Sequence, residues 1–118
     1  MRRFLFDTAV FVYAAGGEHS HRAPCREIVR LQGEGALAGE ASVEILQELA
    51  HVRARGTGDR AAAARYARDV SVLCIVHDVG WPDLRLALTL FEAHAGLDMR
   101  DAVHAATALN RGIDAIRD

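Results

Sequence analysis

The sequence predicts a single α/β domain over residues 1–118, with a short, mostly parallel central sheet flanked by helices on both faces. Short apolar segments alternate along the chain with longer segments of helical periodicity, which is the pattern of strands joined by helices in a parallel sheet. Glycine-rich turns separate many of these segments. A chain of 118 residues is also long enough to bury one hydrophobic core.

The first half of the chain is expected to form strands over 3–7 and 36–41, and helices over 8–15, 21–33 and 42–55. The first strand contains the apolar run Phe4–Phe6, which is typical of a strand buried on both faces. Glycines end the first two helices, at residues 16–17 and 33–35. Ser42 occupies the N-cap position of the third helix, whose apolar residues recur at helical spacing.

The second half is expected to form helices over 60–69, 79–95 and 99–111, and strands over 70–76 and 113–116. β-branched residues are frequent in Val70–Val76 and favour a strand there. Asp78 is placed to cap the following helix, and Pro82 suits its first turn. The last strand is short, which suggests that the C-terminal end of the domain is truncated.

The composition is that of an ordinary soluble protein, with 51% hydrophobic and 25% charged residues. No apolar run approaches the length of a membrane span, and Asp7 interrupts the N-terminal apolar segment, which argues against a signal peptide. We therefore expect a cytoplasmic protein that does not contact membranes. The net charge of −2 argues against a general nucleic-acid binder, although all 14 basic residues are arginines, which suit phosphate recognition.

The cysteines and histidines do not predict a zinc site. Cys25 and Cys74 are far apart in the sequence and lack metal-type spacing, so they are interpreted as small core residues in a reducing compartment. His19 and His21 lie in a loop beside two glycines. We interpret them as solvated loop residues, with a functional pair as the alternative.

Asp7 is the first candidate for a functional site. It directly follows the buried strand and precedes a helix, where a carboxylate is costly to place without a function. In α/β proteins, ligands bind at the carboxyl ends of the strands, so other acids could meet Asp7 there. Glu48 lies at the margin of the apolar face of its helix, whereas Glu44 points away from that face. The alternative, a solvated Glu48, is favoured by helix geometry alone.

The start of the last helix carries the next candidates. Asp98 and Asp101 could both cap this helix, or Asp98 could cap it alone while Asp101 faces the crevice, with His104 one turn later. Three acids without a nucleophile and base pattern suit Mg²⁺ or Mn²⁺, which prefer oxygen ligands. Such sites serve phosphodiester cleavage.

Residues 51–69 form one locally basic stretch in an otherwise slightly acidic chain, with only Asp59 and Asp69 as acids. Its arginines are candidate contacts for RNA phosphates or for an acidic partner. The alternative is a solvated helical surface. The main candidates are Arg53, Arg55, Arg60 and Arg65.

Three segments of the chain resemble the PIN domain family, and more closely its VapC-type ribonuclease toxins. These segments are Phe4–Thr8, Ser42–Leu49 and Arg100–Leu109. Their order and spacing fit the family, and the resemblance covers essentially the whole chain. Each segment alone is a weak signal, whereas all three in order are fairly specific.

The resemblance implies a metal-dependent endoribonuclease, the toxin of a type II toxin–antitoxin pair, which cleaves RNA with a metal-activated water. It implies that Asp7, Glu48 and Asp101 are catalytic and bind Mg²⁺ or Mn²⁺, and that Thr8 supports the site. The implied partners are RNA, a cognate antitoxin and a second copy of the chain in a homodimer. Further candidate supporting residues are Asp98, His104 and Asp118.

Two departures from the family pattern leave a competing hypothesis. The family usually carries Asn or Ser two positions after its first acid, where this chain has Ala9. Its fourth acid follows the last strand, and Asp118 falls slightly early for that match. A catalytically impaired PIN-like domain that binds RNA or protein is therefore the second hypothesis. A small α/β phosphatase or nucleotide binder is the third, weakened by the absence of a phosphate loop.

Overall fold

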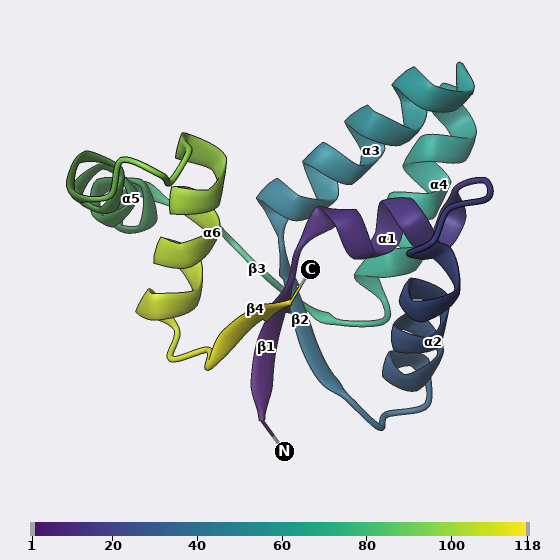
Figure 1. Ribbon diagram of the computed structural model, residues 1–118, viewed down its shortest axis with the longest axis horizontal. Helices are drawn as coiled ribbons and strands as arrows, with labels where there is room; N and C mark the ends of the chain where they lie inside the picture. Colours follow the sequence, from purple (N-terminus) through teal and green to yellow (C-terminus); the bar gives the residue numbers. More distant parts are fainter. Residues whose placement is uncertain (1, 118) are drawn as a thin grey trace.

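The computed structural model describes residues 2–117 and has a four-stranded sheet at its centre (Figure 1). The strands are β1 (Arg3–Phe6), β2 (Ala38–Ser42), β3 (Ile75–His77) and β4 (Ala115–Arg117). All neighbouring strands are parallel, and their order in the sheet is β3-β2-β1-β4. The predicted α/β architecture with a parallel sheet is confirmed.

A pair of helices joins each strand to the next along the chain. The helices are α1 (Thr8–Ala15), α2 (Arg22–Gly33), α3 (Val43–Thr57), α4 (Arg60–Ser71), α5 (Trp81–Ala93) and α6 (Met99–Asn110). In Figure 1, α1 to α4 lie on one side of the sheet and α5 and α6 on the other. Both faces of the sheet are therefore covered, as parallel sheets require. Within the described chain, no helix is long and apolar enough to cross a membrane.

Successive residues of β1 point to opposite faces of the sheet and build two parts of the core. Phe4 and Phe6 pack in the larger cluster, where the ring centroids of Phe6 and Phe11 lie 5.0 Å apart. Leu5 packs in a second cluster that includes Ala108 of α6. Both faces of β1 are buried over Phe4–Phe6, which accounts for the apolar run at these three positions.

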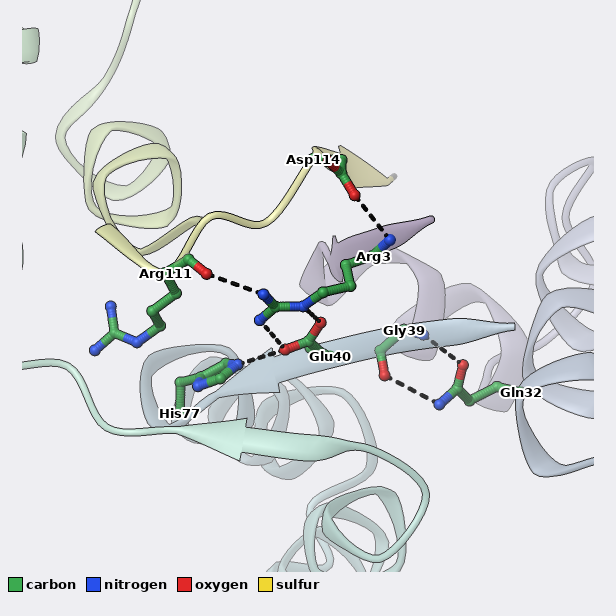
Figure 2. A network of polar contacts seen from close by, with 7 residues as sticks. All are labelled: Arg3, Gln32, Gly39, Glu40, His77, Arg111 and Asp114. Carbon is green, nitrogen blue, oxygen red and sulfur yellow. Dashed lines mark hydrogen bonds and ion pairs between the residues drawn. The ribbon is translucent and has the colours of Figure 1, made fainter. Parts of the chain in front are cut away.

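Gly39 in β2 allows the larger cluster to pack closely against the sheet. A Cβ atom at this position would lie 2.1 Å from the Phe6 ring, which excludes any larger residue without rearrangement. The Gln32 side chain donates a hydrogen bond to the Gly39 carbonyl at 3.0 Å and accepts one from the Gly39 N–H at 2.8 Å (Figure 2). These bonds attach the end of α2 to β2.

The prediction of a strand over residues 70–76 is largely wrong. Helix α4 continues through Val70 to Ser71, and β3 is limited to three residues. Val70 is 1% exposed and packs in the larger core cluster from its position in the helix. Burial in tertiary contacts therefore outweighs the strand preference of β-branched residues. The other element boundaries differ from the predicted ones by one or two residues.

The predicted N-cap of α5 is also wrong. Gly80 is the N-cap residue, and its N–H donates to the carboxylate of Asp83 at 2.9 Å. Asp78 lies two residues before the cap, outside the helix. Pro82 occupies the first turn as predicted. Glycine is itself a common N-cap residue, and here the carboxylate that accepts its N–H comes from inside the helix.

Charged side chains form a buried network where β1 and β2 lie beside the end of α6 (Figure 2). Glu40 of β2 is 3% exposed and accepts two hydrogen bonds from the Arg3 guanidinium, at 2.7 and 2.8 Å. Its Oε1 also lies 2.7 Å from His77 Nε2. The hydrogen bonds from Arg3 hold the pKa of Glu40 below its ordinary value. Because Arg3 and His77 contact both of its oxygens, we interpret the buried Glu40 carboxylate as a structural residue.

Candidate active site

A cavity of about 290 Å³ lies at the carboxyl end of β1, between α1, α3 and α6. Three segments that are far apart in the sequence line it: Asp7, Thr8, Ala9, Val12, Tyr13, Glu48, Val52, Arg100, Asp101 and His104. This end of the sheet is where α/β proteins bind ligands. All three acids that were predicted to converge line this one cavity.

Asp7 follows β1 directly and is the N-cap residue of α1. Its side chain accepts no hydrogen bond from the backbone of that helix. It is partly exposed and lines the cavity, beside a helix N-terminus that favours negative charge. A capping role therefore does not explain why a carboxylate stands at this junction.

Glu48 reaches the cavity from α3 and contacts two side chains of α6. Its Oε1 lies 3.1 Å from Arg100 Nη1, and its Oε2 lies 3.8 Å from His104 Nε2. The Glu48 side chain is 26% exposed, whereas Glu44 is exposed and lies outside the lining of this cavity. Glu44 is therefore a solvated residue of the helix surface, whereas Glu48 is not.

The two acids at the start of α6 have different surroundings. Asp98 is the N-cap, and its carboxylate accepts a hydrogen bond from the Asp101 N–H at 2.8 Å. Asp101 is exposed and lines the cavity, whereas Asp98 is not among the lining residues. Asp98 thus leaves the Asp101 side chain free to face the other acids. The structure brings Asp101 to Asp7 and gives Asp98 a local structural role.

Two buried polar atoms beside the acids have no hydrogen-bond partner among residues 2–117. They are the Thr8 hydroxyl oxygen and His104 Nδ1. Thr8 is 3% exposed and His104 is 5% exposed. Buried polar atoms are normally hydrogen-bonded, so these two atoms indicate a cavity suited to a polar ligand.

The oxygen atoms around the cavity fit a divalent cation chemically, although they do not enclose one. Carboxylate and hydroxyl oxygens are the ligands that Mg²⁺ and Mn²⁺ prefer. Over residues 2–117, no group of three or more His, Cys, Asp or Glu side chains is arranged to hold a metal ion. Glu48 is paired with Arg100 instead. Glu48 could contribute to a cation site with the other acids only after leaving Arg100.

The arginines that were predicted to contact RNA or a partner lie along α3 and α4, outside the lining of the cavity. Arg55, Arg60 and Arg65 are exposed. Arg53 is half-buried, and its guanidinium lies 5.6 Å from the centroid of the Tyr66 ring. The last predicted candidate, Asp118, lies outside the described residues.

A groove of about 430 Å³ between α3 and α6 adjoins the acid cavity and was not predicted from sequence. Its lining residues are Glu44, Gln47, Glu48, His51, Met99, Arg100, Val103 and His104. Polar residues at positions 44, 47, 48 and 51 form one stripe of α3, and this spacing is the signal that could have revealed the groove. Glu48, Arg100 and His104 line both the groove and the acid cavity.

A larger cavity of about 900 Å³ lies between the start of α5 and the end of α6. There Arg111 donates to both carboxylate oxygens of Asp83, at 2.7 and 3.0 Å, and Asn110 donates to one of them at 3.0 Å. The hydrogen bonds from Arg111 hold the pKa of Asp83 well below its ordinary value of 3.8. Because these polar groups satisfy one another, we interpret them as a structural clamp.

The two cysteines have no role at the acid cavity. Cys25 is buried, Cys74 is half-buried, and both are free thiols. Burial raises the pKa of both thiols, to about 11 for Cys74. Neither thiol is therefore activated as a nucleophile, which agrees with the predicted core positions.

Residues 4–118 match the family model of the PIN domain. Ribonuclease VapC7 of Mycobacterium tuberculosis is 39% identical to the chain, over 95% of the chain and 78% of VapC7. Ribonuclease VapC23 of the same species is 34% identical, over 94% of the chain and 87% of VapC23. The similarity therefore extends over nearly the whole chain and most of each relative.

Two solved structures share the fold. The M. tuberculosis toxin VapC20, described as cleaving the sarcin–ricin loop, has a TM-score of 0.77 at 21% identity, covering 96% of the chain and 86% of that protein. A toxin–antitoxin complex from Klebsiella pneumoniae contains a chain with a TM-score of 0.70 at 16% identity, covering 97% and 84% respectively. At such low identity these likenesses support the fold alone.

Proposed function

Because the chain belongs to the PIN domain family and, within it, to the VapC ribonucleases, we propose that it is a Mg²⁺-dependent endoribonuclease. It acts as the toxin of a type II toxin–antitoxin pair and cleaves RNA phosphodiester bonds with an activated water. Its active site is the cavity that Asp7, Glu48 and Asp101 line. The free thiols agree with a reducing cytoplasm as its place of action.

The observation that carries this proposal is the convergence of three acids from distant parts of the chain on one cavity. Asp7 has no capping bond within α1, and Asp98 rather than Asp101 supplies the cap of α6. Local helix chemistry therefore leaves both carboxylates unexplained. A shared ligand of positive charge explains why they lie together, since like charges brought together are otherwise unfavourable.

Each residue around the cavity has a proposed role. Asp7, Glu48 and Asp101 hold Mg²⁺ or Mn²⁺, which would neutralise charge on the phosphate and lower the pKa of the attacking water. The buried hydroxyl of Thr8 supplies a polar contact that orients the acids or a water. His104 positions Glu48, whose carboxylate lies 3.8 Å from the imidazole.

Metal dependence tests this function directly. The purified protein is expected to cleave structured RNA with Mg²⁺ or Mn²⁺ and to lose that cleavage when EDTA is added. Adding Mn²⁺ in excess of EDTA should restore it, because the acids supply oxygen ligands and no side-chain nucleophile. Gel electrophoresis of end-labelled RNA measures the cleavage. Cleavage that persists in EDTA would contradict the proposed chemistry.

The second candidate function is a PIN-like domain that binds RNA or protein without cleavage. Ala9 lines the cavity where the family usually has a polar residue, and Glu48 is paired with Arg100 rather than with the other acids. The same assay separates the two functions. RNA that is bound but stays intact at saturating Mn²⁺ would favour the binding module.

We propose that the groove between α3 and α6 receives the cognate antitoxin. Its lining includes the acids Glu44 and Glu48 and the apolar residues Met99 and Val103. An antitoxin segment with a basic residue beside apolar ones would match this lining. Because the groove opens next to the acid cavity, a segment bound there would also block access of RNA to the acids.

We also propose that the chain forms a homodimer through an apolar stripe on α5. The stripe contains Trp81, Leu84, Leu88 and Phe91, which are 60%, 39%, 45% and 47% exposed. Their spacing of three, four and three residues is that of a helix that packs along a partner helix. Pairing two stripes would bury on the order of 800 Å² of apolar area, about what a standard interface contains.

Replacing Leu88 with Glu is expected to convert the dimer to a monomer, because it places a charge in the centre of the apolar stripe. Size-exclusion chromatography with light scattering measures the mass. Val72→Glu is the matched control, since Val72 is 82% exposed at the end of α4, on the other side of the sheet. A Leu88→Glu protein that keeps the wild-type mass would rule out this surface.

A further inference from the structure

Three aromatic rings gather where α1 ends. The ring of Tyr13 stacks on His19 with centroids 4.5 Å apart and planes inclined by 27°. The His21 ring lies 5.2 Å from Tyr13 and 5.1 Å from His19. We call Tyr13, His19 and His21 the ring cluster. Its two histidines are exposed loop residues, as predicted from sequence, and their rings also contact Tyr13 of α1.

The ring cluster is exposed to solvent and held in place. Both histidines are exposed, and Tyr13 is half-buried against the larger core cluster. The His21 N–H donates to His19 Nδ1 at 3.1 Å, and the Arg22 N–H donates to the His19 carbonyl at 3.1 Å. These bonds order the loop, so its rings are arranged before any ligand binds. The entropic cost of ordering the site would therefore be small when a ligand stacks on the rings.

The ring cluster adjoins the proposed active site. Tyr13 lines the same cavity as Asp7, Glu48 and Asp101. Asp7 and Tyr13 are six positions apart along the chain, which is about 9 Å along a helix. An RNA strand with its phosphate at the acids would therefore bring a nearby base to the rings.

Metal binding does not explain the histidine pair. His19 Nδ1 accepts the hydrogen bond from the His21 backbone, so this ring nitrogen is already engaged. Among residues 2–117, these histidines also belong to no group of three or more His, Cys, Asp or Glu side chains that could hold a metal ion. The flat faces of the rings remain the chemically available feature.

From these observations we propose that the ring cluster is a nucleobase subsite, which stacks an unpaired base of the RNA next to the cleaved phosphate. Single-stranded RNA is commonly recognised by stacking of splayed bases on Tyr, Phe, Trp or His side chains. The subsite rests on the proposed ribonuclease function for its ligand. It would select single-stranded RNA over paired RNA at the cleavage site, because a paired base cannot reach the rings.

The test measures binding of two fluorescein-labelled probes by anisotropy, in EDTA so that RNA stays intact. One probe is a single-stranded 12-nucleotide RNA of mixed sequence, and the other has the same backbone with abasic sites. His19→Ala is expected to weaken binding of the RNA by about fivefold, or about 1 kcal/mol, without weakening binding of the abasic probe. His19→Phe should restore the affinity, because it restores a flat ring.

The control variant is His94→Ala, which removes an exposed histidine after α5, a helix on the opposite side of the sheet from α1. It should leave both affinities unchanged. Unchanged RNA affinity in His19→Ala overturns the subsite, and so does an equal loss for both probes, which would indicate a phosphate contact. Failure of the wild type to cleave RNA with Mn²⁺ overturns the ribonuclease function separately, since base-dependent binding is measured without metal. Equal affinity of the wild type for both probes overturns the subsite alone.

Discussion

Replacing Asp7 with Asn is expected to reduce RNA cleavage by about a thousandfold or more and to leave the fold intact. The substitution keeps the size of the side chain but removes the charge that attracts a cation. Loss of a metal contact at a phosphoryl centre costs several kcal/mol of transition-state stabilisation, and each 1.36 kcal/mol is tenfold in rate. Folding should be unaffected because the Asp7 carboxylate makes no capping bond in α1.

Asp101→Asn is expected to give the same result, since Asp98 supplies the cap of α6. The assays are cleavage of labelled RNA with Mn²⁺, thermal unfolding, and growth of bacteria that express each variant. Glu44→Gln is the matched control, because Glu44 is an exposed acid outside the lining of the acid cavity. Wild-type cleavage and growth arrest in both Asp7→Asn and Asp101→Asn would refute the assignment of this cavity as the active site.

The second large effect is on stability. Arg111→Leu is expected to lower the free energy of unfolding by about 3 to 5 kcal/mol, because it leaves the buried Asp83 carboxylate without its cationic partner. The Asp83 side chain is 4% exposed and accepts two hydrogen bonds from Arg111. Thermal or urea unfolding measures the change. The control is Arg85→Leu, which removes an exposed arginine from the same cavity and should change stability by less than about 0.5 kcal/mol.

The double variant Asp83→Leu with Arg111→Leu distinguishes a buried unpaired charge from simple loss of packing. It should recover part of the stability, because it removes the unpaired charge from the interior, while the Gly80 N–H and the Asn110 amide lose their acceptor. A double variant that is less stable than Arg111→Leu alone would show that the clamp itself contributes the stability. The free energies of unfolding of both variants are compared with that of the wild type under identical conditions.

The same clamp predicts how stability depends on pH. Arg111 lowers the pKa of Asp83 in the folded protein, and Arg3 lowers that of Glu40. A lowered pKa contributes stability above the unfolded-state pKa, which is ordinarily near 4 for these groups, and this stability is lost as pH falls toward the folded value. We therefore expect unfolding midpoints to fall as pH decreases below about 5, and less steeply in Asp83→Asn.

Much of the architecture could be predicted because local chemistry and tertiary packing agree along most of the chain. The apolar run of β1, the Ser42 cap of α3 and the glycine ends of helices all have local physical causes. The prediction of a strand at 70–76 was wrong because Val70 lies in a helix and is buried there in the larger core cluster. A β-branched composition does not show which surface covers a residue. The prediction of Asp78 as the cap of α5 was wrong because Gly80 occupies the cap position and its N–H donates to Asp83 inside the helix.

By itself, the sequence determined that a carboxylate ends the first strand, that further acids follow at helix margins, and that the chain alternates strands with helices. Only the tertiary structure decided that Asp7, Glu48 and Asp101 line one cavity, and that Asp101 faces this cavity while Asp98 supplies the cap. It also decided that the rings of the two loop histidines contact Tyr13. The physical reason is that the spacing of residues along one helix or strand determines which way their side chains point within that element. Which elements lie close together depends instead on how the parallel sheet and its crossover helices pack.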